Sequence, residues 1–427
     1  MEKNYKKERD LEVQYVDRGI IHPLEISDTG RAENRQYGGV TDKNFNFIEL
    51  SLNKRAIGDG YNPINDWYIG ANPNSFGKQI KYIDEDVVFI GPIKCHMLHF
   101  LLETFCRCWF FLNNDNFSYK IAFLTSEDDC PLWEHRVNPF FELLNIDKNR
   151  LLEIKDVTQF RTVIVPEQSF ELNKSYHKKY KDIFDKLKSN VPSASYEKVY
   201  FAKLPDRSIG EDLAVEIFEK NGYTVFIPEY LIIKQMIFIL NGCKELAVSS
   251  GSNAYNAIFL NDSSKLMVLN RSGHVHPIQT MINSLRNLKV TYVDSFTDIL
   301  PVSWDCGPFL FGYTEHLASF LKSKNMIFDE KKLKNATDIN VIKFISAWLE
   351  VQKVYGRALQ AKEGLFIDFV NFVDKISLKL EKKEKKMMDY IFSVRNNSKR
   401  IIYKIFGIKL SIKKTRYDEI KGKKQYE

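Results

Sequence analysis

The sequence predicts an α/β fold with two facing Rossmann-like domains and a basic helical tail. Apolar, β-branched runs of about five to seven residues alternate with helical stretches, which is typical of parallel sheets covered by helices on both faces. The alternation occurs in two blocks, separated by the polar segment 171–195. A lysine-rich stretch follows the second block.

The first block follows a segment rich in turn formers and aromatic residues, residues 1–85, for which we expect short strands and loops that join the first lobe. Residues 86–195 form the first predicted domain, a Rossmann-like domain with its linker. We expect strands at 86–93, 120–125 and 161–166, helices at 96–112 and 131–144, and a polar bridge at 171–195.

The second block, residues 196–328, is the second predicted Rossmann-like domain, and a helical basic tail spans 329–427. Ligands of such sheets bind at the carboxyl ends of the strands, so candidate site residues are sought there. We expect strands at 198–204, 223–228, 245–250, 265–270 and 289–294, and helices at 210–221, 230–241, 253–260 and 276–285.

Composition excludes several classes of protein. The chain has 427 residues, of which 44% are hydrophobic and 27% charged, which excludes a disordered chain, a collagen-like fibre and a small disulfide scaffold. Its apolar runs are far shorter than the ~20 residues of a membrane-spanning helix. The first ten residues are charged and no apolar run follows them, so we expect no signal peptide and a cytoplasmic protein whose six cysteines stay reduced.

The charge is concentrated in the tail. Residues 374–427 contain 17 Lys and Arg against 7 Asp and Glu, whereas the rest of the chain is nearly neutral. Segments 377–394 and 399–410 resemble amphipathic basic helices, so we expect contact with the inner face of the cell membrane, with packing on the body or on a partner protein as the alternative. We expect no nucleic acid partner, since the chain lacks a zinc pattern, an RNA-binding signature and a basic body.

The first candidate site is the segment CHMLHFLLETFCRCW, residues 95–109. His99, Glu103 and Arg107 are spaced i, i+4, i+8 and share one face of a helix. Either His99 or Glu103 could act as the base that abstracts a proton, and the other residue would orient that base. The alternative is a Glu103–Arg107 ion pair beside a structural histidine. The Cys and His spacings here match no structural zinc pattern, so we expect no metal.

Two further candidates follow predicted strands of the second block. Lys203 and Arg207, in KLPDRS, could neutralise a diphosphate, or could be solvated surface cations. Glu229 lies between a strand and a helix and could accept hydrogen bonds from ribose or sugar hydroxyls, or simply favour the helix dipole.

The segment SSGSNAYNAIF, residues 249–259, is the fourth candidate. Gly251 makes the turn after the strand and permits close approach of a ligand, and we expect Ser252 or Asn253 to cap the next helix. Free amides at that helix end suit phosphate, with Ser250 and Asn256 nearby. The alternative is an ordinary capped helix. Loops 271–277 and 303–313 could line a sugar site but are expected to be structural.

These motifs together resemble glycosyltransferase family 61. HFLLETFCRCW (99–109) is similar to the family's HFLLE…RLW helix, KLPDRS (203–208) to its R…R element, and residues 226–259 to its PE…Q…GHGAGLTN…F stretch. The resemblance spans roughly 85–295. Ser250 stands where the family has histidine and Lys203 where it has the first arginine; of Ala-Gly-Leu-Thr-Asn only Asn256 is kept. These departures bear on the identity of the donor.

The resemblance implies a GT-B-like fold, a nucleotide-sugar donor, inversion at the anomeric carbon and no metal or other cofactor. We expect a UDP-linked donor and, as in bacterial members of the family, an acceptor in capsular or other surface polysaccharide assembly, either an oligosaccharide or a lipid-linked glycan. The alternatives are transfer of a pyruvyl or phosphosugar group on the same scaffold, or an inactive glycan-assembly scaffold protein.

Overall fold

The computed structural model describes residues 5–27, 35–54, 80–93, 99–113, 118–125, 137–204, 208–273, 275–297, 299, 307–359, 392–396, 400–405 and 408–413. Contacts divide the chain into two compact units. The first comprises Met1–Thr297 and Trp304–Ser346, and the second comprises Asp298–Ser303 and Ala347–Glu427.

The first sheet of the first unit is mixed. Within the described ranges it has seven strands in the order β3-β2-β7-β4-β5-β6, with β1 also paired to β7. β4 to β7 pair in parallel, and β1 to β3 are antiparallel additions from the N-terminal segment. The predicted strands at 86–93, 120–125 and 161–166 are confirmed as parts of β4, β5 and β7. The bounds are β1 Val13–Asp17, β2 Ile20–Ser27, β3 Arg35–Thr41, β4 Lys81–Ile93, β5 Lys120–Thr125, β6 Leu151–Glu153 and β7 Thr158–Pro166.

The helix predicted over 96–112 is helical but is not a regular α-helix. It consists of a π-helix, η4 (Phe100–Thr104), followed by a 3₁₀-helix, η5 (Phe105–Leu112), and residues 94–98 lie outside the described part. Its apolar residues occur on all sides, so it is buried all round and packing overrides ideal helix geometry. The helix predicted over 131–144 is described only as α2 (Asn138–Leu143).

The polar segment predicted to bridge the two domains, 171–195, forms regular structure. It contains a packed helix, α3 (Lys178–Ser189), whose buried residues recur at helical spacing between the charges: Tyr180, Ile183, Phe184 and Leu187. Short elements complete this region: η1 Glu49–Ser51, η8 Lys148–Arg150, β8 Phe170–Glu171 and β9 Ser175–Tyr176.

The second sheet is parallel throughout. Its five described strands have the order β12-β10-β13-β14-β15. All the strands and helices predicted for 198–294 are present, with the helix at 253–260 adopting 3₁₀ geometry. The bounds are β10 Lys198–Phe201, α4 Glu211–Lys220, β12 Thr224–Phe226, η9 Pro228–Tyr230, α5 Ile233–Gly242, β13 Glu245–Ser249, η10 Ser252–Phe259, β14 Lys265–Asn270, α6 Pro277–Leu285, β15 Lys289–Asp294 and α7 Glu315–Ser323. A small parallel pair joins β11 (Ser208–Ile209) to β16 (Phe309–Leu310).

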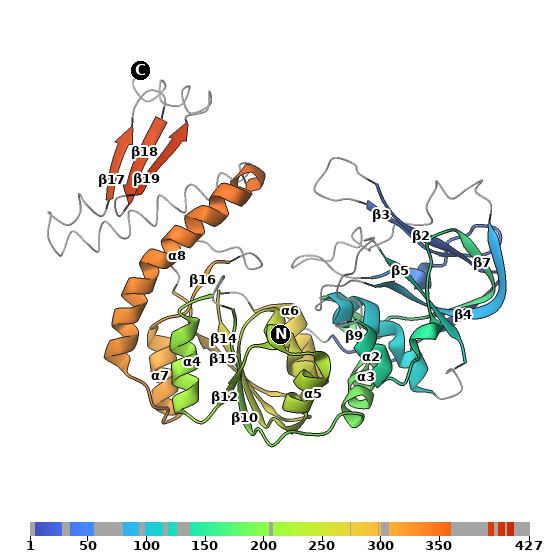
Figure 1. Cartoon of the computed structure of the whole chain (residues 1–427), viewed down its shortest axis with the longest axis horizontal. Helices are drawn as coiled ribbons and strands as arrows, with labels where there is room; N and C mark the ends of the chain where they lie inside the picture. The colour runs from blue at the N-terminus through green and yellow to red at the C-terminus, as the bar shows by residue number, and fades with distance from the viewer. Residues whose placement is uncertain are drawn as a thin grey trace. The chain divides into compact units, whose positions relative to one another are not determined.

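Helices cover both faces of this second sheet (Figure 1), as the alternating apolar residues require. On one face, Ala247 and Met267 join the core beneath α4 and α7. On the other face, Leu246 and Leu266 join the core beneath α5 and α6.

A single apolar cluster connects the helices of both sheets. α3 is at its centre: the Tyr180 hydroxyl donates to the Leu101 carbonyl in η4 at 2.9 Å, and the Phe184 ring lies 5.3 Å from that of Phe259 in η10. The two sheets are therefore joined through a shared helical layer that includes α3.

The tail prediction needs a correction. The described residues of the predicted helix 399–410, which are 400–405 and 408–410, are strands: β17 (Phe392–Asn396), β18 (Arg400–Ile405) and β19 (Ile408–Lys413) form an antiparallel sheet. The β-branched run favours a strand, and the register pairs Ile401 with Ile412 and Ile405 with Ile408. The segment predicted as a helix at 377–394 lies outside the described part up to residue 391, and 392–394 belong to β17. α8 spans Glu330–Leu359. None of the helices described here has the length and apolarity needed to cross a membrane.

Candidate functional site

The topology of the second sheet defines where a ligand can enter. The chain runs from β10 outward to β12 and then returns to β13 on the other side of β10. Such a reversal leaves a crevice at the carboxyl ends of the two central strands. Lys203 follows β10 there and Gly251 follows β13, so the fold brings these two predicted segments to the same edge.

The turn after β13 is built around Gly251. Its φ of +114° and ψ of −161° are strained for residues with a Cβ atom, and its carbonyl accepts from the Ala254 amide at 2.9 Å. The predicted cap by Ser252 or Asn253 is wrong: Gly251 itself is the N-cap and no side chain caps η10. Because the helix begins one residue earlier than expected, both side chains belong to its first turn.

Three predicted residues meet beside this turn. The Asn253 side-chain amide donates to Glu229 Oε1 at 3.1 Å, and the Asn256 side-chain amide donates to the Asn253 carbonyl at 3.1 Å. Both asparagines are buried, whereas Glu229 is exposed. η9 and η10 therefore place the exposed Glu229 carboxylate beside the Gly251 turn.

The loop after β10 is held by a glutamate that sequence reasoning missed. Glu211, only 3% exposed, accepts from the Tyr200 hydroxyl (2.5 Å), the Lys203 amide (3.0 Å) and the Ser208 hydroxyl (2.8 Å). Its sequence signal is an acidic residue in the first turn of the helix after the loop. Arg207 lies outside the described residues.

Arg271 is a second residue that the sequence did not single out by its charge. It directly follows β14, and its amide donates to the Ser250 hydroxyl at 3.1 Å. Its guanidinium carbon lies 3.8 Å from the centre of the Phe309 ring. Burial lowers the pKa of Arg271 to about 10. The sequence signal that could have identified Arg271 is a basic residue directly after the strand that became β14, the neighbour of β13.

The predicted His99–Glu103 pair forms. His99 Nδ1 lies 2.5 Å from Glu103 Oε2; the imidazole is 35% exposed and the carboxylate only 3%. This segment follows the carboxyl end of β4, and the Thr104 hydroxyl holds it there by donating to the Pro92 carbonyl at 2.7 Å. The arrangement is that of an accessible imidazole oriented by a buried carboxylate.

Arg107 is the third residue of the predicted His99–Glu103–Arg107 helix face, and its environment differs from that of His99. It is fully buried and donates to the carbonyls of Pro166 (3.0 Å), Leu50 (3.2 Å) and Leu52 (2.6 Å). The helix is fixed by this side chain to the end of β7 and to the N-terminal segment. Arg107 is thus a structural anchor of the site.

Residues 97–267 match the family model described as Glycosyltransferase 61. The match begins two residues before His99 and ends within β14, so it includes the His99–Glu103 pair, both second-sheet loops and η10. The chain carries a glycosyltransferase family 61 domain. It is therefore a glycosyltransferase, as the motifs indicated, and its substrates are a sugar donor and a glycan acceptor. No curated protein matches the chain significantly.

Two loops considered for the sugar site of the glycosyltransferase have structural contacts. His276 caps α6, its Nδ1 accepting from the Ile278 amide at 3.2 Å. Phe309, from the loop 303–313, lies under Arg271. Residue 274 and residues 303–306 lie outside the described part.

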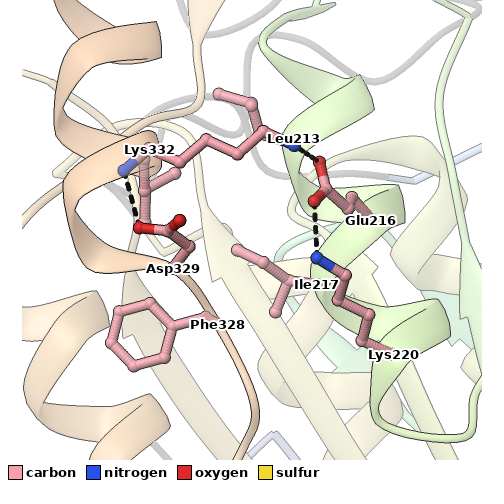
Figure 2. A pocket seen from close by; sticks show the side chains of 8 residues that line it. Leu213, Glu216, Ile217, Lys220, Phe328, Asp329 and Lys332 are labelled. Atoms are coloured by element: carbon pink, nitrogen blue, oxygen red, sulfur yellow. Dashed lines mark hydrogen bonds and ion pairs between the residues drawn. The ribbon is translucent and has the colours of Figure 1, made fainter.

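A small pocket of the glycosyltransferase lies between α4 and the first turns of α8 (Figure 2). Glu216 is its central charged residue and pairs with Lys220 at 2.7 Å and with Lys332 at 2.5 Å. None of the predicted site residues lines it. Across the described ranges, no group of three or more His, Cys, Asp or Glu side chains is placed to hold a metal ion.

Proposed function

We propose that this glycosyltransferase moves a sugar from a UDP-linked donor to a hydroxyl of a surface (capsular) polysaccharide or lipid-linked glycan, with inversion and without a metal. In this proposal the sheets are the acceptor domain (86–195) and donor domain (196–328) of a GT-B-like arrangement. The observation that carries it is the pairing of accessible His99 with buried Glu103 at the end of β4. The second support is the gathering of donor-binding groups at the β10–β13 crevice.

The donor diphosphate is proposed to lie against the Gly251 turn. The amides of Ser252 and Asn253 begin η10 there, and helix N-termini favour anions. Lys203 and Arg207 supply positive charge, so the leaving nucleoside diphosphate is stabilised by preorganised donors and cations. Glu229, held by Asn253, accepts from ribose or sugar hydroxyls.

His99 is the proposed base. A carboxylate on Nδ1 fixes the tautomer, which leaves Nε2 able to accept a proton. Nε2 takes the proton of the acceptor hydroxyl, the hydroxyl oxygen bonds to the anomeric carbon, and the bond to the diphosphate oxygen breaks with its electron pair leaving on the diphosphate. One direct displacement inverts the configuration. Glu103 is the positioning residue because its carboxylate is buried.

The test is transfer or donor hydrolysis with a panel of nucleotide sugars, using His99→Ala and Glu103→Gln. Loss of a general base lowers the rate by roughly 10²–10⁴-fold. We expect His99→Ala to lose at least ~100-fold and Glu103→Gln at least ~10-fold in kcat, while UDP still raises Tm in both variants.

His316→Ala and Glu219→Gln, at exposed positions in α7 and α4, are the matched controls and should retain full activity. If both site variants stay within threefold of the wild-type rate, the base assignment fails. If no nucleotide sugar is consumed and no nucleotide raises Tm, the donor class is wrong.

The proposed location is the cytoplasm, peripherally at the inner face of the cell membrane, through residues 374–427. Support comes from the net positive charge of this segment, which favours contact with anionic lipid headgroups.

A further inference from the structure

Arg271, which is half-buried, differs in its partners from the buried arginines Arg107 and Arg286. The guanidinium of Arg107 meets three carbonyls, and that of Arg286 meets Asp185 and the Ile258 carbonyl. Among the residues that the structure describes, the Arg271 guanidinium meets no carboxylate and no hydrogen-bond acceptor, and its Nε is buried without a partner. A buried charge without a partner is costly unless a ligand supplies one.

The nearest acidic group is already occupied. Glu211 is close enough to act on the charge of Arg271, but its two oxygens accept from Tyr200, Lys203 and Ser208. It therefore provides a favourable field without serving as the missing acceptor. The Phe309 ring holds the plane of the guanidinium, which leaves the edge with Nε as the side that needs an acceptor.

This guanidinium lies directly on the Gly251 turn. A Cβ atom added to Gly251 would be 2.1 Å from Arg271 Nη2, so only glycine fits between the turn and the arginine. The start of η10 and the Arg271 guanidinium therefore lie next to each other at the carboxyl ends of β13 and β14.

We infer that Arg271 binds a phosphate group of the donor's leaving diphosphate through Nε–H and a neighbouring Nη–H. The inference rests on the proposed function, and it names the group that the Gly251 turn and its adjacent cation recognise. Arginine suits this role because its planar fork matches phosphate oxygens bidentately. Arg271 lies outside residues 97–267, so the family match does not assign it a role.

The test measures binding of UDP, uridine and inorganic pyrophosphate to the full chain by titration calorimetry, with Arg271→Gln and Arg271→Lys. Charged hydrogen bonds of this kind correspond to about 10–100-fold in affinity. We expect Arg271→Gln to weaken UDP and pyrophosphate by that factor and leave uridine unchanged. Arg271→Lys, which keeps the charge but loses the fork, should be intermediate.

Arg150→Gln is the matched control, because Arg150 also lies over a phenylalanine, Phe111, but in the first sheet's domain. It should leave UDP affinity unchanged. Without ligand, Arg271→Gln should not lower Tm by more than about 2 °C, because it removes a half-buried charge that has no acidic partner among the described residues. A large fall in Tm with unchanged UDP affinity would show a structural role and overturn the inference.

The remaining outcomes separate the two proposals. If UDP binds to the wild type and to Arg271→Gln within twofold, the inference fails while the proposed function stands. If pyrophosphate binding depends on Arg271 but no nucleoside diphosphate binds, the phosphate site stands and the proposed donor fails. If neither UDP nor pyrophosphate binds to the wild type, both fail.

Discussion

Two buried glutamates organise the side chains that carry the proposed chemistry. Glu103 orients His99, and Glu211 closes the loop that contains Lys203. In the sequence both are acidic residues of helical segments, and such residues usually face solvent. Their burial arises because each has a polar partner that compensates its desolvation.

At Glu211 the contacts predict a measurable loss of stability. Glu211→Gln leaves an amide that cannot accept from the Tyr200 hydroxyl, the Lys203 amide and the Ser208 hydroxyl together. We expect the free energy of unfolding in urea to fall by about 2–4 kcal/mol. UDP affinity should fall as well, since the loop loses its anchor.

Glu219→Gln, an exposed change in the same helix α4, should alter stability by less than about 0.5 kcal/mol. Equal effects of the two substitutions would show that the Glu211 contacts do not hold the loop.

At the scale of elements, the segment before β1 is attached by ion pairs to the turn after β7. Lys7 contacts Glu167 at 2.9 Å and Glu171 at 2.8 Å, and Arg9 contacts Glu167 at 2.6 Å. Burial by itself would raise the pKa of Glu167, but hydrogen bonds from Arg9, the Glu12 amide and Lys7 outweigh it and lower this pKa to about 2.

This lowered pKa predicts a pH-dependent contribution to stability. A carboxyl with a pKa of about 2 when folded and about 4.5 when unfolded stabilises the fold fully above pH 4.5. The contribution is lost as the pH falls from about 4.5 to 2. In urea unfolding, the wild type should therefore exceed Glu167→Gln by ~1–3 kcal/mol at pH 7, and the gap should shrink towards pH 3.

Glu8→Gln, which removes a solvent-exposed ion pair with Lys6, is the control and should change little at any pH. A gap between wild type and Glu167→Gln that stays constant from pH 7 to 3 would contradict the assignment.

The two helical segments at the proposed site share an irregular geometry. η4 is a π-helix next to His99, and η10 is a 3₁₀-helix that begins at the Gly251 turn. Such departures from α-helical geometry are frequent at functional sites because they re-aim side chains or amides. Here each follows the carboxyl end of a central strand, where the topology places ligands.

At the scale of the whole molecule, the positive net charge and the two sheets lie in different parts of the sequence. The first unit contains the two sheets and their shared core, whereas the basic excess lies in residues 374–427. Attraction to anionic lipid depends on the number of basic residues near the surface, each worth about 1 kcal/mol, and not on whether they occur in helices or strands. The correction from helix to sheet over 400–405 and 408–413 therefore leaves the membrane proposal in place.

Reversing four tail charges tests that proposal. The quadruple change of Lys382, Lys383, Lys385 and Lys386 to Glu should reduce co-sedimentation with phosphatidylserine-containing vesicles by more than ~10-fold at 0.15 M salt. The same charge change in the body, with Lys43, Lys155, Lys178 and Lys289 replaced by Glu, should reduce it much less. Equal effects would show that net charge alone, not the tail, drives binding.

Much of the fold could be predicted because its signals are local. The strands of the second sheet are short apolar runs with β-branched residues, and each is followed by a helix of regular apolar spacing. The helix prediction was wrong over 400–405 and 408–410 because the apolar residues there fit a helical face as well as a strand. Only pairing partners such as Ile412 for Ile401 decide between the two.

The candidate site likewise has some residues that local sequence predicts and others whose roles depend on tertiary contacts. His99 and Glu103 are four residues apart, so helical spacing alone brings them together, and the Gly251 turn is a local strand-to-helix junction. The roles of Glu211 and Arg271 depend on residues from other elements, so no local pattern announces them.

By itself the sequence determined the order of strands and helices, the family and the His99–Glu103 pair, because periodicity and short motifs act over a few residues. Only the tertiary structure decided which strand ends meet, that Arg107 is an anchor, and that Arg271 lies on Gly251 with no acceptor among the described residues. The physical reason is that burial and the satisfaction of charge are properties of neighbours in space, and the chain brings those neighbours together only on folding.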